Sequence, residues 1–393
     1  MEKIIAYNGF DKDLKIRGSQ YEVDKWFEFN DYEYYEDGFS SYLNPLKVLE
    51  DYDPANSRFC EVEHGGEMIN EDDDTIVSKK IFIKREFDLY ELVKSAIYYT
   101  NKNVNWDFVK LFDLNYDIET CIVNKSAVSS TGFCSVIANT GKESIVSNGA
   151  NYSIAANTGD FSISHSYGNC SVATNTGNWS AVTNKGEFSL SMNTGLYSIA
   201  LCDGDHSVVS NTGYKSTAIN KGDTSVSVAT GYNSKSENIG NHSVSVITNC
   251  ESNVTAKGFY SIATSTGSTT TATTNGIFSS AINTGDFSKS VTNGKSSISA
   301  STGKLSVAKS VGKRSVAVST GDESVSLVEG GDSIAVVTGH YGKAAGALGC
   351  WLVLSEVDVD KIIDVQVVKV DGVNIKPNVY YQLVKGKVVK TNY

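Results

Sequence analysis

The middle of the chain repeats one pattern of small, polar and apolar positions every nine residues. Stepping by nine through residues 126–333 meets 24 positions, of which 23 are Ser and one is Thr270. The same step through residues 132–339 meets Gly at 22 of 24 positions, and the exceptions are Ala150 and Asn249. The unit reads G-x-x-S-x-(A/S/V)-x-x-(T/N/K), and a fixed period of this kind predicts a solenoid.

Within the unit, the Ser and the small residue two places later share one face of an extended strand. A face of Ser, Ala and Val fits only a thin interior, where the hydroxyls must pair along the stack or with turn backbone. The fourth and sixth positions are mixed, for example Val316 in one unit and Lys235 in another, so they face solvent. We expect Gly to supply positive-φ corners, and Asn157 before Gly159 to supply turn chemistry.

Two nonapeptides per coil are favoured over three, because a triangular coil normally encloses side chains bulkier than Ser and Ala. This arrangement predicts a flattened β-roll of about 12 coils, roughly 58 Å long at ~4.8 Å per coil. The predicted fold is therefore mainly β: a parallel β-solenoid with an α/β N-terminal domain and a small β C-terminal cap. The predicted boundaries are 1–120 for the head with its linker, 121–345 for the solenoid and 346–393 for the cap.

The two flanks lack the repeat and carry ordinary strand and helix patterns. In the head we expect strands at 4–7, 14–29 (with a turn at Gly18), 59–63 (closed by Gly65 and Gly66) and 80–84, and helices at 44–52 and 88–100. Residues 101–119 lead into the first coil and cap it. In the cap, the apolar strand 350–354 plugs the last coil, and short strands follow at 362–370, 379–384 and 387–391.

Charge separates the head from the rest of the chain. The net charge of −11 comes from residues 1–120, which hold 14 Lys and Arg against 27 Asp and Glu. Residues 121–393 hold 20 basic and 18 acidic residues, so the solenoid is close to neutral. A neutral solenoid disfavours mimicry of DNA, and no segment is basic enough to bind nucleic acid.

The cysteines and the first residues bear on location. The seven cysteines are scattered without a CxxC pair, which is typical of reduced thiols in a cytoplasmic protein. The opening MEKIIAYNGF lacks the apolar run of a signal peptide, and no segment is long and apolar enough to span a bilayer. We therefore expect a bacterial cytoplasmic protein or a component of a phage particle, not one secreted through a signal peptide.

The repeat resembles calcium-binding β-rolls in period but not in ligands. Those rolls place an Asp at a fixed step, whereas here Asp160, Asp205, Asp223, Asp286 and Asp322 follow Gly only in some units. The five His residues are isolated from one another, and no hydrolase or kinase signature is present. We therefore predict no metal site, no cofactor and no catalytic residue.

Aromatic residues gather two places after Gly in the early units. They are Phe161, Trp179, Phe188 and Tyr197. One interpretation is a platform for sugars or a partner protein; the other, which we favour, is a stacking ladder at the coil corners. Outer Thr residues such as Thr271 suggest ice binding, but Lys, Glu and Val interrupt that face.

Nearly the whole chain resembles an uncharacterised family of phage and prophage proteins. The similarity lies in the opening from Tyr7 to Val23, the segment GFSSYLNPLKVLEDY (38–52), RFCEVE (58–63), the NTG-x-x-S units and LGCWLVLSE (348–356). The resemblance implies a viral or prophage origin and carries no established activity. The family's His-x-Cys after Gly-Phe is replaced here by Ser40-Ser41-Tyr42.

The head also resembles, more distantly, the small antibiotic-modifying ADP-ribosyltransferases. The shared features are the AYNGF strand, the FCEVE strand and the acidic loop 71–74. By that resemblance the His that grips NAD falls on Asn8, and the catalytic acid falls on Asp72 or Asp73. The other interpretation, which we favour, makes the loop a solvated turn on a head used for protein contact.

These observations favour a non-enzymatic phage or prophage protein in which a rigid solenoid presents the acidic head to a protein partner, from the virion or the host. The candidate interaction surface comprises Phe161, Trp179, Phe188, Tyr197, Asp72 and Asp73. One alternative is an NAD-dependent effector acting through the head, and another is an inhibitor that sequesters a host factor. Self-association through outer residues such as Ile298, Val307, Val316 and Val325 is a further expectation.

Overall fold

The computed structural model describes residues 4–28, 38–70, 74–105, 107, 109–112, 116, 118–359 and 361–392. The chain divides into two compact units, residues 1–201 with 211–217 and residues 202–210 with 218–393. Unit 1 holds the head and the first coils, and unit 2 holds the later coils and the C-terminal strands.

The nine-residue units form two long sheets, and successive units alternate between them. Within the described residues, the sheet that contains the even-numbered coil strands β8 to β34 has sixteen strands and is called the even sheet. The sheet that contains the odd-numbered coil strands β9 to β35 has fifteen and is called the odd sheet. Strands two units apart pair in parallel, as when Ile145 of β12 lies opposite Ala127 of β10, eighteen residues earlier. Two nonapeptides per coil are therefore confirmed, in a parallel solenoid of about 13 turns over residues 118–354.

The even sheet consists of β8 (Val109–Phe112), β10 (Ala127–Ser130), β12 (Ile145–Asn148), β14 (Ile163–Ser166), β16 (Ala181–Asn184), β18 (Ile199–Cys202), β20 (Thr217–Asn220), β22 (Lys235–Asn238), β24 (Asn253–Ala256), β26 (Thr271–Thr274), β28 (Lys289–Thr292), β30 (Val307–Ser310), β32 (Val325–Val328), β34 (Lys343–Gly346), β37 (Tyr380–Val384) and β38 (Lys387–Thr391).

The odd sheet consists of β9 (Ile118–Cys121), β11 (Val136–Asn139), β13 (Ile154–Asn157), β15 (Val172–Asn175), β17 (Leu190–Asn193), β19 (Val208–Asn211), β21 (Val226–Ala229), β23 (Val244–Ile247), β25 (Ile262–Ser265), β27 (Ser280–Asn283), β29 (Ile298–Ser301), β31 (Val316–Ser319), β33 (Ile334–Val337), β35 (Trp351–Asp358) and β36 (Lys361–Lys369). β8 and β9 pair with β10 and β11, so residues 101–119 supply the first rungs of the stack as well as its lead-in.

The lattice Ser residues form hydrogen-bond ladders through the interior, as their spacing predicts. The backbone N–H of Ser225 donates to Oγ of Ser243 one coil later, at 3.1 Å. Oγ of Ser243 donates in turn to the carbonyl oxygen of Asn241, at 2.9 Å. Both hydroxyls are buried, so each of these bonds avoids the ~1–3 kcal/mol that an unmet buried polar group costs.

The Asn two places before Gly also points inward. Asn157 donates from Nδ2 to the carbonyl oxygen of Ser144 at 3.3 Å, and its Oδ1 accepts from the N–H of Gly159 at 3.0 Å. The predicted turn chemistry is therefore confirmed at Asn157. The same side chain also ties one corner to the previous coil, which the sequence pattern did not indicate.

The prediction that the lattice Gly residues supply positive φ is wrong. The left-handed residue is the one two places after Gly, as at Phe161 (φ 53°) and Trp179 (φ 49°). Gly is required at the corner because coils approach too closely for a side chain: a Cβ on Gly240 would lie 2.0 Å from the carbonyl oxygen of Gly222.

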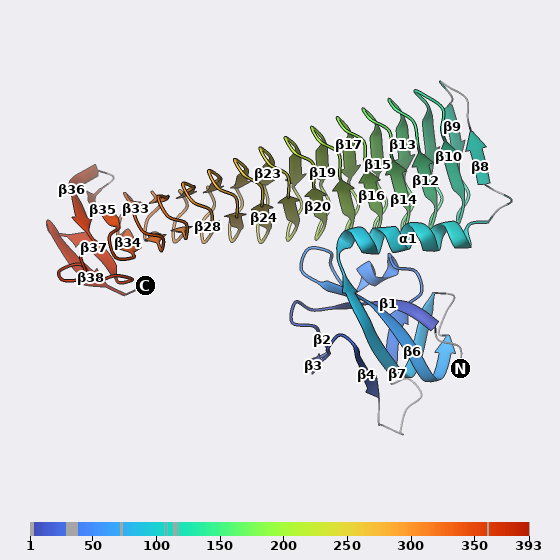
Figure 1. Cartoon of the computed structure of the whole chain (residues 1–393), viewed down its shortest axis with the longest axis horizontal. Coiled ribbons are helices and arrows are strands. Elements are labelled where there is room, and N and C mark those ends of the chain that lie inside the picture. The colour runs from blue at the N-terminus through green and yellow to red at the C-terminus, as the bar shows by residue number, and fades with distance from the viewer. Residues whose placement is uncertain are drawn as a thin grey trace. The chain divides into compact units, whose positions relative to one another are not determined.

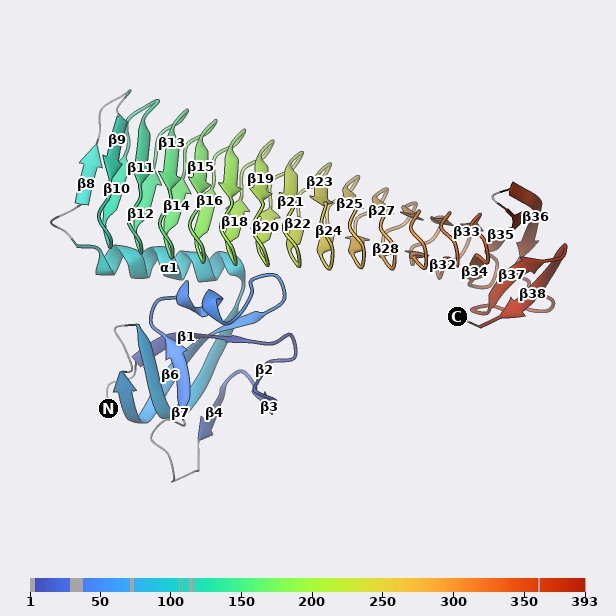
Figure 2. The same cartoon turned by 180° about the vertical axis from the view of Figure 1, so that it is seen from behind.

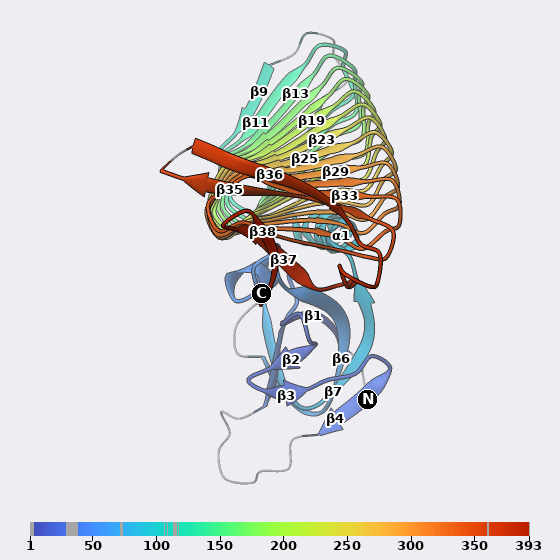
Figure 3. The ribbon, with the colours of Figure 1, turned by 90° about the vertical axis from the view of Figure 1, so that its left-hand side faces the viewer.

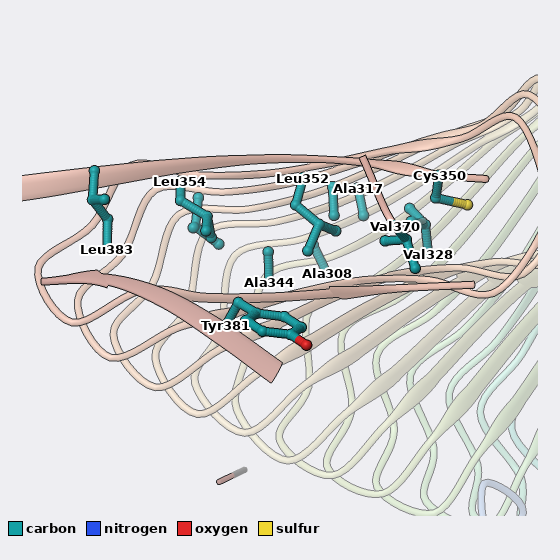
Figure 4. Packing of buried hydrophobic residues seen from close by; sticks show 12 residues of the cluster. Ala308, Ala317, Val328, Ala344, Cys350, Leu352, Leu354, Val370, Tyr381 and Leu383 are labelled. Carbon is teal, nitrogen blue, oxygen red and sulfur yellow. The ribbon is translucent and has the colours of Figure 1, made fainter. Parts of the chain in front are cut away.

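The C-terminal strands close the far end of unit 2. β35 continues the odd sheet, and Leu352 and Leu354 take the inward places that Ala335 and Val337 hold one coil earlier. They pack with Tyr381 and other buried residues in one cluster, shown in Figure 4. β36 and the β37–β38 hairpin then pair antiparallel along the last rungs (Figure 3). The predicted plug at 350–354 and the three strands after it are confirmed.

The head is a small antiparallel sheet that closes on itself. It comprises β1 (Ile4–Phe10), β4 (Lys25–Glu28), β5 (Phe39–Tyr42), β6 (Arg58–Asn70) and β7 (Thr75–Phe87), in the order β4-β7-β5-β1-β6, with β6 pairing back onto β7 (Figure 2). The hairpin of β2 (Lys15–Ile16) and β3 (Ser19–Gln20) turns at Gly18 as predicted. Ala6, Phe10 and Ile83 belong to its core.

Two expectations for the head need correction. The strand predicted at 59–63 does not end at Gly65 and Gly66, because β6 runs on to residue 70 with a register shift at that point. The helix predicted at 44–52 is a single 3₁₀ turn, η1 (Lys47–Glu50), with Asn44 Oδ1 accepting from the N–H of Leu46.

The predicted second helix is α1 (Leu89–Asn103), which follows β7 directly. The carboxylate of Asp88 caps it by accepting from the N–H of Glu91 at 2.9 Å. Its buried stripe includes Leu92, Val93 and Ala96. The helix runs beside the first coils of unit 1 and contacts β12 (Figure 1). In the described part of the chain, no helix has the length and apolar character needed to cross a bilayer.

Candidate functional site

The aromatic candidates fall on two different corners of the coil. Phe161, Trp179 and Tyr197 lie where odd strands turn into even strands, whereas Phe188 lies where an even strand turns into an odd one. The rings of Phe161 and Trp179 stack with centroids 5.2 Å apart and planes 6° apart. The stacking ladder is therefore confirmed for this pair, and the four residues do not form one platform.

Tyr197 ends the first aromatic run with a different set of contacts. Its ring meets Tyr214 edge to face at 5.7 Å, and the ammonium of Lys215 lies 5.6 Å from its centre. The contacts join one coil to the next and stabilise the corner.

A second aromatic ladder on the other corner escaped the sequence analysis. His242, Tyr260 and Phe278 stack in succession, with centroids 5.2 and 5.1 Å apart. Their spacing of eighteen residues is the signal that could have revealed them, because it equals one full coil. Positions eighteen residues apart lie on the same corner, whereas positions nine residues apart lie on opposite corners.

The Asp residues after Gly act as backbone acceptors between coils. Oδ1 of Asp160 accepts from the N–H of Asn178 at 2.9 Å, and Oδ1 of Asp223 accepts from the N–H of Asn241 at 2.7 Å. Asp205, Asp286 and Asp322 make the same bond one coil onward. In the described residues, no group of three or more acidic, His or Cys side chains is arranged to hold a metal ion.

A His and a Ser meet in the core of the head. Nδ1 of His64 lies 2.7 Å from Oγ of Ser78, which itself donates to the carbonyl oxygen of Lys80 at 2.6 Å. Ser78 therefore receives the bond from His64, the opposite of the direction in which a base activates a nucleophile. Burial lowers the pKa of His64 to about 4, so its imidazole is neutral at pH 7.

Asn8 is fixed by bonds to neighbouring segments of the head. Its Nδ2 donates to the carbonyl oxygen of Ser40 at 3.0 Å and to Oγ of Ser41 at 3.2 Å, and its Oδ1 accepts from the N–H of Gly9. The side chain is buried, so it joins β1 to β5. The other candidates from the same resemblance, Asp72 and Asp73, lie outside the described residues.

A polar pocket lies in unit 1 where the head, α1 and the first coils meet. Its volume is about 250 Å³, and Asn44, Asp74, Tyr99, Thr100, Asn103, Lys125 and Glu143 line it. The buried carboxylate of Asp74 accepts a hydrogen bond from the hydroxyl of Tyr99 and pairs with Nζ of Lys47 at 3.0 Å. Lys125 and Glu143 pair at 3.6 Å.

The comparisons with known proteins concern the head alone. Residues 4–95 match a family model described as a domain of unknown function (DUF7666). No curated protein and no solved structure matches the chain. The DUF7666 match ends inside α1, so it covers the closed sheet and the carboxylate of Asp74 but none of the coils.

The pocket lies where the region that matches DUF7666 meets α1 and the first coils. Each charged residue in its lining has an opposite charge at hand, and Asn103 Nδ2 donates to the carbonyl oxygen of Tyr99. The volume lies below the ~300–1,000 Å³ typical of small-molecule sites. The arrangement suits fixing the head on α1 and on the first coils better than holding a dinucleotide.

Proposed function

We propose that this protein is a non-enzymatic structural or interaction protein of phage or prophage origin, in which the solenoid holds the acidic head for a protein partner. The observation that carries the proposal is the use of the repeat's polar side chains. The lattice Ser, the Asn before Gly and the Asp after Gly bond coil to coil, so they build a stiff support. The origin rests on the resemblance of the sequence to phage and prophage proteins.

The acidic head is the part suited to contact a partner. It carries the excess of 13 negative charges, whereas the solenoid and cap together are slightly basic. Exposed carboxylates such as Asp13 add to a field that steers a basic protein surface toward the head. The partner we propose is therefore a protein with a basic face, from the particle or from the host.

The two alternatives remain predictions. An NAD-dependent effector requires a residue that grips NAD, and Asn8 in that place is buried and bonded to its neighbours. A sequestering inhibitor requires a host target and is compatible with the same acidic surface. The identity of the partner separates this inhibitor from a particle component.

The experiment is a pull-down with the full tagged chain from infected or prophage-induced cells, read by mass spectrometry. We expect one dominant protein partner, whose recovery falls at least tenfold when Asp13→Lys and Glu67→Lys are combined in the head. The matched control combines Glu187→Lys and Glu251→Lys in the solenoid, with the same change of charge, and should retain the partner. Equal loss with both pairs would contradict the assignment to the head.

Calorimetry with NAD tests the enzymatic alternative separately. We expect no saturable heat with the full chain. Saturable binding that Asp72→Asn and Asp73→Asn abolish would overturn the non-enzymatic proposal.

A further inference from the structure

The outer face of the odd coil strands in unit 2 is uncharged and largely apolar. The first four residues of each strand from β21 to β35 present two side chains outward, sixteen positions in all. Fourteen are apolar, and the others are Ser280 and Thr264. Ile298 is 47 % exposed and Trp351 is 43 % exposed. The strands pair in register throughout, so these side chains form two continuous rows.

The even sheet of the same unit provides the contrast. Its fourteen outward positions from β22 to β34 include five charged residues: Lys235, Glu237, Lys289, Lys309 and Lys343. Such charges on a sheet face keep it solvated and separate from other sheets. Both sheets come from the same repeat, so the repeat itself does not require the lack of charge on the odd face. Of the outer residues predicted for self-association, Ile298 and Val316 lie on the odd face, and Val307 and Val325 lie on the even face.

Unit 1 shows how this chain uses apolar outer positions elsewhere. All four residues of β14 and of β16 are buried, including the outward-facing Ile163 and Ala181. The even sheet is thus covered at β14 and β16 in unit 1, whereas its outer positions in unit 2 include charged residues such as Lys289 and Lys309. The outer face of the odd sheet in unit 2 has the apolar composition without a cover from its own unit.

The apolar face continues past the last coil. β36 pairs antiparallel with β35, which places Val367 beside Val353 and Val365 beside Ser355. Val367 is 58 % exposed and Val365 is 50 % exposed. The face therefore ends on two more exposed β-branched residues and on Lys369, which lies opposite Trp351 with its ammonium 5.8 Å from the centre of the indole ring.

We infer that this face binds the same face of a second copy of the chain, which goes beyond the proposed function. Four-residue strands of ~13 Å stacked eight deep at ~4.8 Å give a footprint of ~500 Å² per copy and ~1,000 Å² for the pair. That area reaches the lower bound of a stable interface. The rows repeat at the strand spacing, and another copy offers the same spacing, so side chains of the two sheets interdigitate about a twofold axis.

Sedimentation velocity of the full chain over a range of concentrations tests the inference. We expect a dimer whose dissociation constant rises at least about 100-fold with Ile298→Lys, because the twofold axis buries that charge twice. The matched control is Thr273→Lys on the even sheet, whose strand neighbours Thr255 and Val291 are uncharged. It should leave the dissociation constant within about threefold of wild type.

A variant that should strengthen the dimer distinguishes an effect on the interface from simple misfolding of the Lys variant. Ser280 interrupts the row between Ile262 and Ile298, so Ser280→Val completes it. We expect Ser280→Val to lower the dissociation constant about threefold to tenfold. A wild-type chain that stays monomeric up to ~200 µM would overturn the inference. So would an equal effect of the two Lys variants. Binding of a monomeric chain to phosphatidylcholine vesicles would assign the face to a lipid surface and overturn it as well.

Discussion

At the scale of single residues, the corner of each coil places opposite demands on neighbouring positions. The lattice Gly must lack a side chain because the previous coil lies against it. A Cβ on Gly240 would come within 2.0 Å of the Gly222 carbonyl oxygen. Two places later the backbone takes a left-handed conformation that glycine would suit, yet Thr224 and His242 occupy it. The repeat thus uses Gly for close packing and accepts local strain beside it.

Gly240→Ala should therefore destabilise the solenoid by at least about 3 kcal/mol, because the new methyl group forces two coils apart. Gly331→Ala is the control, since no atom lies within 4 Å of the added carbon there. We expect that control to change the free energy of unfolding by less than about 1 kcal/mol. Urea titration followed by circular dichroism compares the two, and similar losses would contradict the packing role of Gly240.

A substitution that relieves the left-handed strain should instead raise the free energy of unfolding. Thr224 has φ 54° and a β-branched side chain, whereas Asn tolerates this conformation. Thr224→Asn should raise the free energy of unfolding by ~0.5–1 kcal/mol. Thr302→Asn, at an exposed corner position outside the left-handed set, should change it by less than about 0.5 kcal/mol. A loss of stability at Thr224 would show that the Thr side chain has a packing role.

At the scale of the element, the burial of a strand's outward side chains depends on what covers its outer side. β14 carries His165 outward, yet only 3 % of this residue is exposed. Nδ1 bonds with the hydroxyl of Thr183 on β16, and the ring meets Tyr167 edge to face at 4.1 Å. Burial lowers the pKa of His165 to about 4, and the positive charge of Lys185 acts in the same direction.

This burial makes stability depend on pH in a defined window. The folded pKa lies below the ordinary 6.5, so the unfolded chain takes up a proton first and stability falls as pH drops from 6.5 toward 4. The total loss from His165 is up to about 3 kcal/mol. His165→Phe should flatten the slope between pH 6.5 and 4 while leaving the dependence above pH 7 parallel to wild type. An unchanged slope in urea titrations would contradict the burial of a neutral His165.

At the scale of the whole molecule, the stack must end without offering open strand edges. In unit 2 that task falls to β36, β37 and β38, which pair antiparallel on the last rungs and pack on the buried Leu352 and Leu354. Antiparallel strands of this length stop the regular parallel stacking. The apolar outer face of the odd sheet is a separate surface, which runs along the stacking direction.

Truncation of the chain after Asp358 should cause the protein to form assemblies that keep growing by stacking end to end. The cut exposes the edges of β34 and β35 together with the cluster around Leu352. We expect light scattering to increase with time and concentration for the shortened chain, while the full chain reaches a fixed size. A shortened chain of fixed size would show that the last coil blocks stacking without the cap.

Much of the fold could be predicted because the repeat encodes side-chain direction locally. Ser at the third position and a small residue at the fifth have to face inward wherever the strand is extended, and Ser243 with Ser245 does so. Less of the candidate site could be predicted from the sequence. The nine-residue pattern groups Phe188 with Phe161, because both follow Gly by two places, yet an odd number of units separates them, so they occupy opposite corners.

The sequence by itself determined the period, the inward ladder and the helix that begins at Asp88, since these follow from spacing and local geometry; it favoured two units per coil, which the pairing of strands eighteen residues apart established. Only the tertiary structure decided why Gly240 must be Gly, why Asp160 serves as an acceptor and which outer positions are covered. These depend on residues eighteen apart along the chain coming within bonding distance, and on the head lying in the same unit as the first coils. A nonapeptide does not specify its neighbour in the next coil; the stacking of coils does.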